Sequence, residues 1–436
     1  MLTKVQSGGN RGASSSGTIL LLRFISLRRI RRASYAPLLA IGMGLMMVRL
    51  LAMAKLLEIG EFATLSSALI LSGLVNTIAC FGLFLHLQRM LPIELARHHH
   101  RASIVLMSQT IIAAFGVGGI GIIVGASGVS LGGISADMVL LGAIHGLSQQ
   151  LFLIATTESR SNNETVRYSV QHLLRSLSTV LLGVVAAVVV GSASAVLIAE
   201  AAVAFVSVAA ILKSAGRRFN ATPSKALLLG IRSLRRVDWI SMLALLAYSV
   251  VVAMSVQLDR WLSSVVLPTK AFASYSFAWI AMIAALSAQA LVNASVYPMI
   301  ARRFALSGRK AAYRLTFLVS FGMLAACLVP AVVGVFVADF LIARYYPAYT
   351  DAIALVPILA MAAIFRISDF WSSFLIIDGK ERRALIATTL SLLGTVAVWY
   401  FAIGGQFSSV NLAYLAAAVS IVTYVIPFGL SWHARA

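Results

Sequence analysis

The stretch VQLDRWLSSVVLPTKAFASYSFAW, residues 256–279, joins the end of one long apolar run to the start of another. Each run has about 20 residues, which is enough to cross the hydrocarbon core of a bilayer as a helix. A helix also satisfies its own backbone hydrogen bonds, as lipid requires. The stretch therefore predicts two transmembrane helices joined by a short turn, with the adjacent charges of Asp259 and Arg260 close to the membrane surface.

The rest of the chain repeats this pattern. Of its 436 residues 60% are hydrophobic and 11% are charged, whereas soluble proteins have about 25% charged residues. The apolar runs are continuous rather than alternating, which favours helices over a β-barrel. The sequence predicts an all-α polytopic membrane protein with about twelve spans, at 36–57, 62–85, 102–125, 137–157, 168–190, 193–213, 238–258, 271–295, 312–337, 352–377, 384–403 and 410–432.

The basic residues predict the orientation. Of the 35 Lys and Arg residues, 28 lie in the N-terminal segment, in the loops after even-numbered spans, or at the C-terminus. Basic residues stay on the cytoplasmic side, so we expect both termini to be cytoplasmic. The net charge of +21 then reflects topology and attraction to anionic membrane lipids rather than binding of nucleic acid.

The spans divide into two similar halves. Arg49 precedes Phe62 by 13 residues, and Arg260 precedes Phe272 by 12. Duplicated halves are common in transporters, where the substrate site lies between the repeats. We predict four segments: a basic cytoplasmic tail (1–35), an N-terminal six-helix lobe (36–213), a basic cytoplasmic linker (214–237) and a C-terminal six-helix lobe (238–436).

Four arginines are candidates for binding an anionic substrate: Arg49, Arg175, Arg260 and Arg366. An Arg at mid-membrane costs about 2.5–3.5 kcal/mol on insertion scales, so it normally faces the bundle interior or water. Its planar fork of donors also matches phosphate oxygens. For Arg260 the alternative is an interfacial anchor, since it lies at the end of a span.

Three acids are candidates for ion coupling or for structural pairing: Glu200, Asp259 and Asp369. Glu200 either binds a coupling cation or pairs with Arg175 on the preceding span. Asp369 follows Arg366 by three residues on one helical face, so the two can pair with each other. Asp259 and Arg260 are adjacent and cannot face each other, so we expect Asp259 to brace a neighbouring span while Arg260 points to the mouth of a cavity.

Several segments resemble polysaccharide-biosynthesis membrane proteins. VRLLAMAKLLEIGEFATLSSALILSGLVNTIACFGL is similar to the opening of that family. VQLDRWL, FASYSFAW and VYPMIARR look like its seventh and eighth spans, and ARYYPAYTDAIALVPILA looks like its segment between spans 9 and 10. The resemblance covers nearly the whole chain. The sequence departs from the family at Glu61, where Gly often precedes the Phe, and at Pro347, which replaces a usual Gly.

The resemblance implies a Wzx-type O-antigen or exopolysaccharide flippase of the multidrug/oligosaccharidyl-lipid/polysaccharide exporter superfamily. Such proteins move undecaprenyl-diphosphate-linked oligosaccharides between leaflets for lipopolysaccharide or exopolysaccharide synthesis, with two six-helix lobes around a central cavity. The expected partners are the lipid-linked oligosaccharide, anionic lipids, and a polysaccharide polymerase with its chain-length regulator. The alternative is a cation-coupled multidrug exporter of the same superfamily.

An enzyme is not expected, because the outer loops are short and no catalytic motif is present. No cofactor is expected either. His98, His99 and His100 are adjacent, which is poor spacing for a metal, so we expect them to form part of a solvated loop. We expect Tyr275, Trp279 and Tyr297 either to stack on sugars or to anchor and pack their helices.

Overall fold

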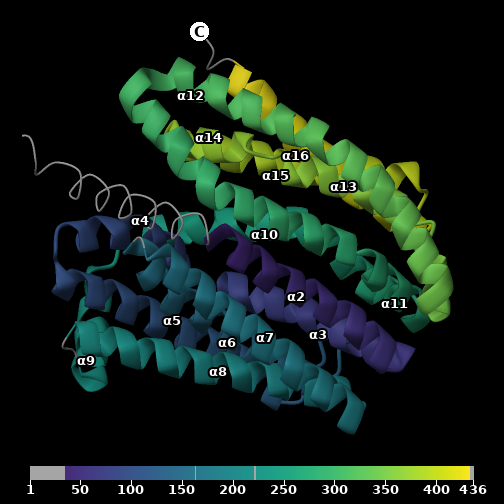
Figure 1. Ribbon diagram of the computed structural model, residues 1–436, viewed down its shortest axis with the longest axis horizontal. Coiled ribbons are helices and arrows are strands. Elements are labelled where there is room, and N and C mark those ends of the chain that lie inside the picture. The colour runs from purple at the N-terminus through teal and green to yellow at the C-terminus, as the bar shows by residue number, and fades with distance from the viewer. Residues whose placement is uncertain (1–34, 163, 220–221, 433–436) are drawn as a thin grey trace, which may run out of the picture.

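The structure is a computed structural model that describes residues 35–162, 164–219 and 222–432 (Figure 1). Every regular element in these ranges is helical, and twelve segments are long and apolar enough to span a membrane. All twelve overlap the spans predicted from the sequence, so the all-α polytopic fold is confirmed. The predicted N-terminal tail, residues 1–35, lies outside the described residues apart from Tyr35.

The N-terminal half is a bundle centred on one helix. Its helices are α2 (Tyr35–Leu56), α3 (Ile59–Ile78), α4 (Leu83–Ala96), α5 (His100–Ala126), α6 (Ala136–Ser161), α7 (Thr165–Val189) and α8 (Ala193–Arg218). α6 is central and contacts α3, α5 and α8, while α2 packs along α7. The approach of α6 to α3 needs a glycine, because a Cβ on Gly146 would lie 2.5 Å from the carbonyl oxygen of Ser72.

The second membrane helix is shorter than predicted. We expected it to continue to residue 85, but α3 ends at Ile78 and α4 begins at Leu83 after a turn. Gly82 in this turn has φ +80°, and a Cβ there would lie 2.1 Å from the carbonyl oxygen of Met242. Both the left-handed backbone and the close approach require glycine. Because Met242 belongs to the C-terminal half, this turn is a point of contact between the two halves of the protein.

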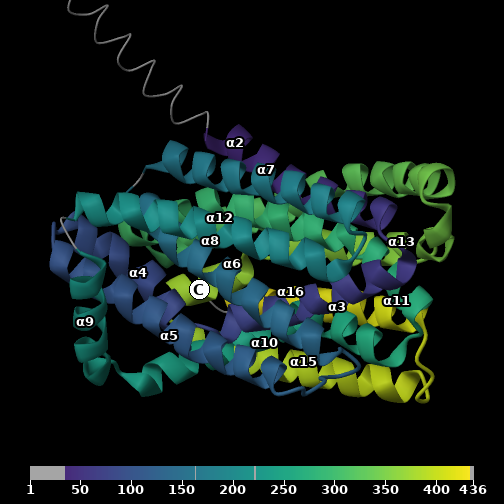
Figure 2. The same cartoon turned by 90° about the horizontal axis from the view of Figure 1, so that it is seen from below.

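The segment predicted as a basic linker is partly helical. It contains α9 (Pro223–Ser233) and a 3-10 turn, η1 (Leu234–Arg236). Proline at the first helical position suits the start of a helix. α9 packs on α5 and runs across the direction of α8 (Figure 2).

The C-terminal half contains several interrupted helices. Its elements are α10 (Trp239–Val266), α11 (Thr269–Ala278), α12 (Ile280–Tyr345), η2 (Pro347–Ala352), α13 (Val356–Ile367), α14 (Trp371–Ile377), α15 (Glu381–Ala402) and α16 (Ser409–Trp432). The predicted loop between the eighth and ninth spans is instead helical. α12 continues through it and departs from helical backbone at Gly308, whose φ of +78° lets the chain reverse there.

The two halves lie side by side (Figure 1). α10 contacts α3 and α4, and α11 contacts α3. At the α11 end Lys55 donates to the carbonyl oxygen of Tyr345 at 2.8 Å, and the Phe62 and Tyr349 rings meet edge to face at 5.6 Å. Toward the opposite end the ribbons of α12 and α4 diverge in Figure 1. In the predicted orientation the α11 end faces outward.

Candidate functional site

Arg49 on α2 is held by the carboxylate of Glu200 on α8. Arg49 Nε and Glu200 Oε1 are 2.8 Å apart, and the two side chains are 6% and 0% exposed. The N–H direction falls outside hydrogen-bond geometry, so the contact is an ion pair. The other carboxylate oxygen lies 3.3 Å from His145 Nε2 on α6. Glu200 therefore holds α2, α6 and α8 together.

His145 extends this contact to a fourth helix. Its Nδ1 lies 2.7 Å from the hydroxyl oxygen of Ser72 on α3, and its Nε2 lies 3.2 Å from Gln149 Nε2. The sequence alone did not indicate that His145 faces Glu200. The available signal was that both are polar residues within apolar spans, which commonly pair with each other.

Arg175 on α7 does not pair with Glu200, contrary to one of the two alternatives for that acid. Among the described residues no ion pair within 4.0 Å joins the two, because Glu200 is taken by Arg49 and His145. The Arg175 guanidinium carbon instead lies 4.3 Å from the ring centre of Phe152, a cation–π arrangement. Its Nε is buried with no hydrogen-bond partner in the described chain.

Asp259 and Arg260 near the end of α10 point to different partners. The hydroxyl of Tyr275 donates to Asp259 Oδ2 at 2.5 Å, and the indole N–H of Trp279 donates to the same oxygen at 3.1 Å. Asp259 thus braces α11. Arg260 lies over Trp279, 4.9 Å from its ring centre, and its buried Nε has no partner within the described ranges. Tyr275 and Trp279 are buried by these contacts and do not present a face to a sugar.

Arg49, Arg175 and Arg260 form a group of buried cations linked through Arg49. Arg49 lies close enough to both of the others for its charge to act on theirs. The group contains cations from α2, α7 and α10, drawn from both halves of the chain. Like charges in a buried site repel, and Glu200 at Arg49 and Asp259 beside Arg260 offset part of that repulsion.

Arg366 and Asp369 are close in sequence but do not pair. Among the described residues they form no ion pair within 4.0 Å. Arg366 donates from Nε to Ser420 Oγ at 3.1 Å and from Nη2 to the carbonyl oxygen of Ser255. Asp369 lies between α13 and α14, where it accepts from the Ser372 hydroxyl at 3.0 Å. Both side chains line a cavity of about 280 Å³ inside the C-terminal half.

A second charge network was missed by the sequence analysis. Glu158, which is 0% exposed, lies 3.3 Å from both Arg167 and Arg218 and accepts from Asn162 at 2.8 Å. Glu164 joins the same two arginines at 2.9 and 2.8 Å. The sequence signal for this network was the presence of two acids, Glu158 and Glu164, in an otherwise basic loop. This network ties the predicted cytoplasmic ends of α6, α7 and α8 together.

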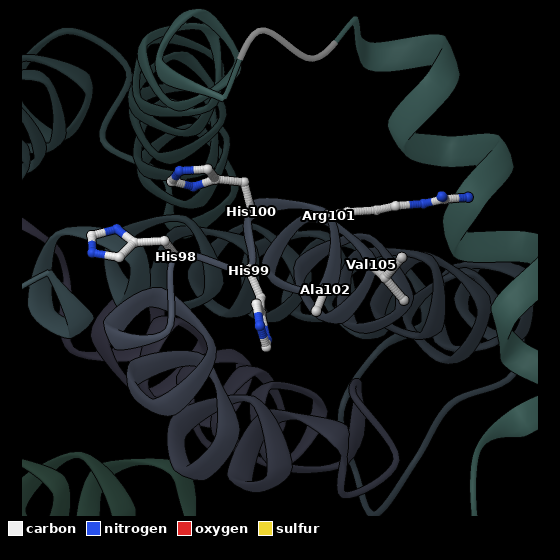
Figure 3. A pocket seen from close by; sticks show the side chains of 6 residues that line it. All are labelled: His98, His99, His100, Arg101, Ala102 and Val105. Carbon is white, nitrogen blue, oxygen red and sulfur yellow. The ribbon is translucent and has the colours of Figure 1, made fainter.

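The three consecutive histidines line a surface hollow of about 650 Å³ with Arg101, Ala102 and Val105. Figure 3 shows the three imidazoles pointing in different directions. His99 Nδ1 lies 2.9 Å from the carboxylate oxygen Oε2 of Glu94. In the ranges described, no group of three or more His, Cys, Asp or Glu residues has the geometry of a metal site.

Comparisons with known proteins identify the fold. No family model matches the sequence, and no curated protein matches it. Solved structures do match. A eukaryotic MATE transporter has a TM-score of 0.56 at 14% identity, with 94% of this chain and 98% of that chain covered.

Two further matches are transporters of the MOP superfamily. One is a Pyrococcus furiosus transporter, with a TM-score of 0.57 at 13% identity over 92% of this chain and 93% of that chain; its structure is described as having a reversed polarity of the binding pocket that suggests a different function. The other is an outward-facing multidrug resistance MATE family transporter, with a TM-score of 0.58 at 14% identity over 92% and 93%. The chain therefore has the twelve-helix fold of the MATE-like transporters of the MOP superfamily.

Proposed function

We propose that the protein is a transporter that flips undecaprenyl-diphosphate-linked oligosaccharide repeat units from the inner to the outer leaflet, by alternating access of its two halves. The observation that carries the proposal is the group formed by Arg49, Arg175 and Arg260. Each has a buried guanidinium nitrogen without a hydrogen-bond partner in the described chain. Buried unpartnered donors are costly, and a diphosphate supplies the oxygens that would satisfy them.

The chemistry of the cargo matches this group. A diphosphate must cross a layer that does not solvate its charge, and planar guanidinium forks bind phosphate oxygens with strong charge-assisted hydrogen bonds. Glu200 is bound by Arg49 and His145, and Asp259 accepts from Tyr275 and Trp279, so both acids already have partners in the protein. We propose that these two acids are structural and that Arg366 contributes in a separate cavity.

The structural comparisons support transport, and one of them bears on the substrate. The Pyrococcus furiosus protein has the same fold, and the reversed pocket polarity named for it suggests a different function for that protein. A cationic centre in the present chain fits an anionic cargo better than a cationic drug. The second candidate is a cation-coupled multidrug exporter, favoured by the likeness to a multidrug resistance MATE transporter.

The cellular setting follows from this cargo. We propose a bacterial plasma membrane with both termini in the cytoplasm, since 28 of the 35 basic residues would then face inward. The exported repeat units would pass to a polymerase and its chain-length regulator for lipopolysaccharide or exopolysaccharide synthesis.

The testing experiment is depletion of the protein in its host. Lipids are extracted, undecaprenyl-diphosphate oligosaccharides are identified by mass spectrometry, and their leaflet is scored with an impermeant lectin. We expect a completed repeat unit to accumulate on the inner leaflet. An unchanged pool together with raised drug sensitivity would instead support the exporter.

Variants connect this result to the arginines. Each single change, Arg49→Ala, Arg175→Ala or Arg260→Ala, should weaken binding of undecaprenyl diphosphate to the purified protein about tenfold or more, since a hydrogen bond to a charged group contributes about 1.5–3 kcal/mol. Arg344→Ala is the matched control, because Arg344 is exposed at the α11 end. Wild-type binding by all three variants would remove the group from the substrate path.

A further inference from the structure

The cavity inside the C-terminal half is the second polar site of the protein. It is lined by α10, α12, α15 and α16 and by the break between α13 and α14. Its polar lining includes Ser255, Gln289, Asn293, Arg366, Asp369 and Ser372. A volume of about 280 Å³ is slightly below the range of drug-sized ligand sites, which suits a group as small as one sugar ring.

We propose that this cavity is a sugar subsite, which binds one neutral monosaccharide unit of the transported oligosaccharide. This inference rests on the proposed function and adds to it, because it separates the place where the sugar binds from the place where the diphosphate binds. It also replaces the expectation that Tyr275 and Trp279 stack on sugars, since both are committed to Asp259.

The charge of the cavity selects a neutral ligand. The guanidinium of Arg366 opposes a bound cation, and the carboxylate of Asp369 opposes a bound anion. The two groups do not pair with each other; Arg366 is held by Ser420 and Asp369 by Ser372, so each places its own charge on the lining. A sugar hydroxyl both donates and accepts, so vicinal hydroxyls can satisfy the two groups together.

The hydrogen-bonding groups of the lining are incompletely used. The side-chain oxygen of Asn293 is buried and has no partner among the described residues. Gln289 is oriented by its bond to the carbonyl oxygen of Asp369, at 3.2 Å. A buried amide oxygen without a partner is costly, and a hydroxyl donor entering the cavity would satisfy it. Ala290, which also lines the cavity, is exposed.

The position of the cavity fits one cargo that spans both sites. Ser255, on its lining, precedes Arg260 by five residues on α10, which is about 7.5 Å along the helix axis. Arg366 also lies within electrostatic reach of Asp259. The cavity therefore lies within about two helical turns of Arg260, although Ser255 and Arg260 are on different faces of α10.

The test uses the full chain in lipid nanodiscs and sugars that carry no phosphate. Saturation-transfer NMR is recorded with the methyl glycosides of glucose, galactose, rhamnose and N-acetylglucosamine. We expect at least one glycoside to bind, and its affinity to fall at least tenfold in Asp369→Asn and in Asn293→Ala. Asp339→Asn is the matched control, since Asp339 is exposed on α12, and it should bind as the wild type does.

Two results would overturn the inference. The first is that no glycoside of the four binds, or that binding is the same in both cavity variants as in the wild type. The second is that no glycoside binds, that the wild type broadens the sodium-23 NMR line, and that Asp369→Asn removes this broadening. That result would assign the cavity to a monovalent cation. Because the probes lack phosphate, glycoside binding without undecaprenyl diphosphate binding would overturn the proposed cargo and leave the sugar subsite standing.

Discussion

The ion pair between Arg49 and Glu200 allows a quantitative prediction about stability. We expect Glu200→Leu to lower the free energy of unfolding by about 3–5 kcal/mol, the usual cost of removing one partner of a buried pair. Glu200 is 0% exposed and lies 2.8 Å from Arg49, so the change leaves a buried guanidinium without its counter-charge. His145 loses its 3.3 Å contact with Glu200 but keeps its 2.7 Å contact with Ser72, so the unpaired charge left behind is that of Arg49.

A double variant separates lost charge pairing from lost packing. Arg49→Met combined with Glu200→Leu replaces the pair with apolar side chains of similar length, which is often neutral or stabilising. We expect it to recover most of the stability lost in Glu200→Leu. The assay is equilibrium unfolding in mixed micelles, followed by tryptophan fluorescence. Asp339→Asn, an exposed change, should stay within about 0.5 kcal/mol of the wild type.

Either of two results would show that Arg49 and Glu200 do not form a stabilising buried ion pair. A loss below about 1 kcal/mol in Glu200→Leu would mean that water reaches Arg49 in the folded protein. A double variant no more stable than Glu200→Leu would mean that the loss comes from packing rather than from charge.

Three further predictions concern the backbone, pH dependence and topology. Gly82→Ala should destabilise the protein by at least about 2 kcal/mol, because the φ of Gly82 is +80° and a Cβ there would lie 2.1 Å from the carbonyl oxygen of Met242. Gly44→Ala is the control, since a Cβ at Gly44 would have no atom within 4 Å. Equal unfolding free energies for the two variants would contradict the close approach at Gly82. Partial burial raises the pKa of the Glu164 carboxyl, but hydrogen bonds from Arg167 and Arg218 outweigh this effect and lower the pKa below the ordinary 4.5. Its contribution is therefore present above that value and lost as pH falls through the lowered pKa, so wild type and Glu164→Gln should differ in unfolding at pH 7 and converge in acid; a constant difference would count against the network. Ser130→Cys should react with an impermeant maleimide from outside the cell and Ser224→Cys should not, and the opposite labelling would invert the topology.

Hydropathy was sufficient to predict the spans, because each must be long and apolar whatever its neighbours are. The interruptions were harder to predict. The turn at Gly82 depends on the approach of Met242, and the reversal at Gly308 follows from a single backbone conformation inside a helical stretch. Neither a tertiary contact nor one φ angle changes the average hydropathy around it.

The site was predicted as a set of residue types rather than as contacts. Charges within apolar spans identified Arg49, Arg175, Arg366 and Glu200, since such charges need a reason to be there. The partners could not be predicted in the same way. Glu200 meets Arg49, which is 151 positions away, rather than Arg175 on the neighbouring span, because sequence proximity does not determine which faces of the helices meet.

The uneven burial of the spans has a consequence for sequence divergence. None of the most apolar window of the span Leu306–Tyr345 is buried within the protein, whereas 67% of the window of α6 is. A segment with no buried residue in that window is constrained mainly by its hydropathy, so Leu, Ile, Val and Phe can replace one another there at little cost. The constraint on individual residues falls instead on α6, on the glycines between helices and on the buried charges. Two chains can therefore keep the same twelve-helix arrangement while sharing 14% of their residues, and comparisons limited to the buried helix faces should show more identity than comparisons of the whole chain.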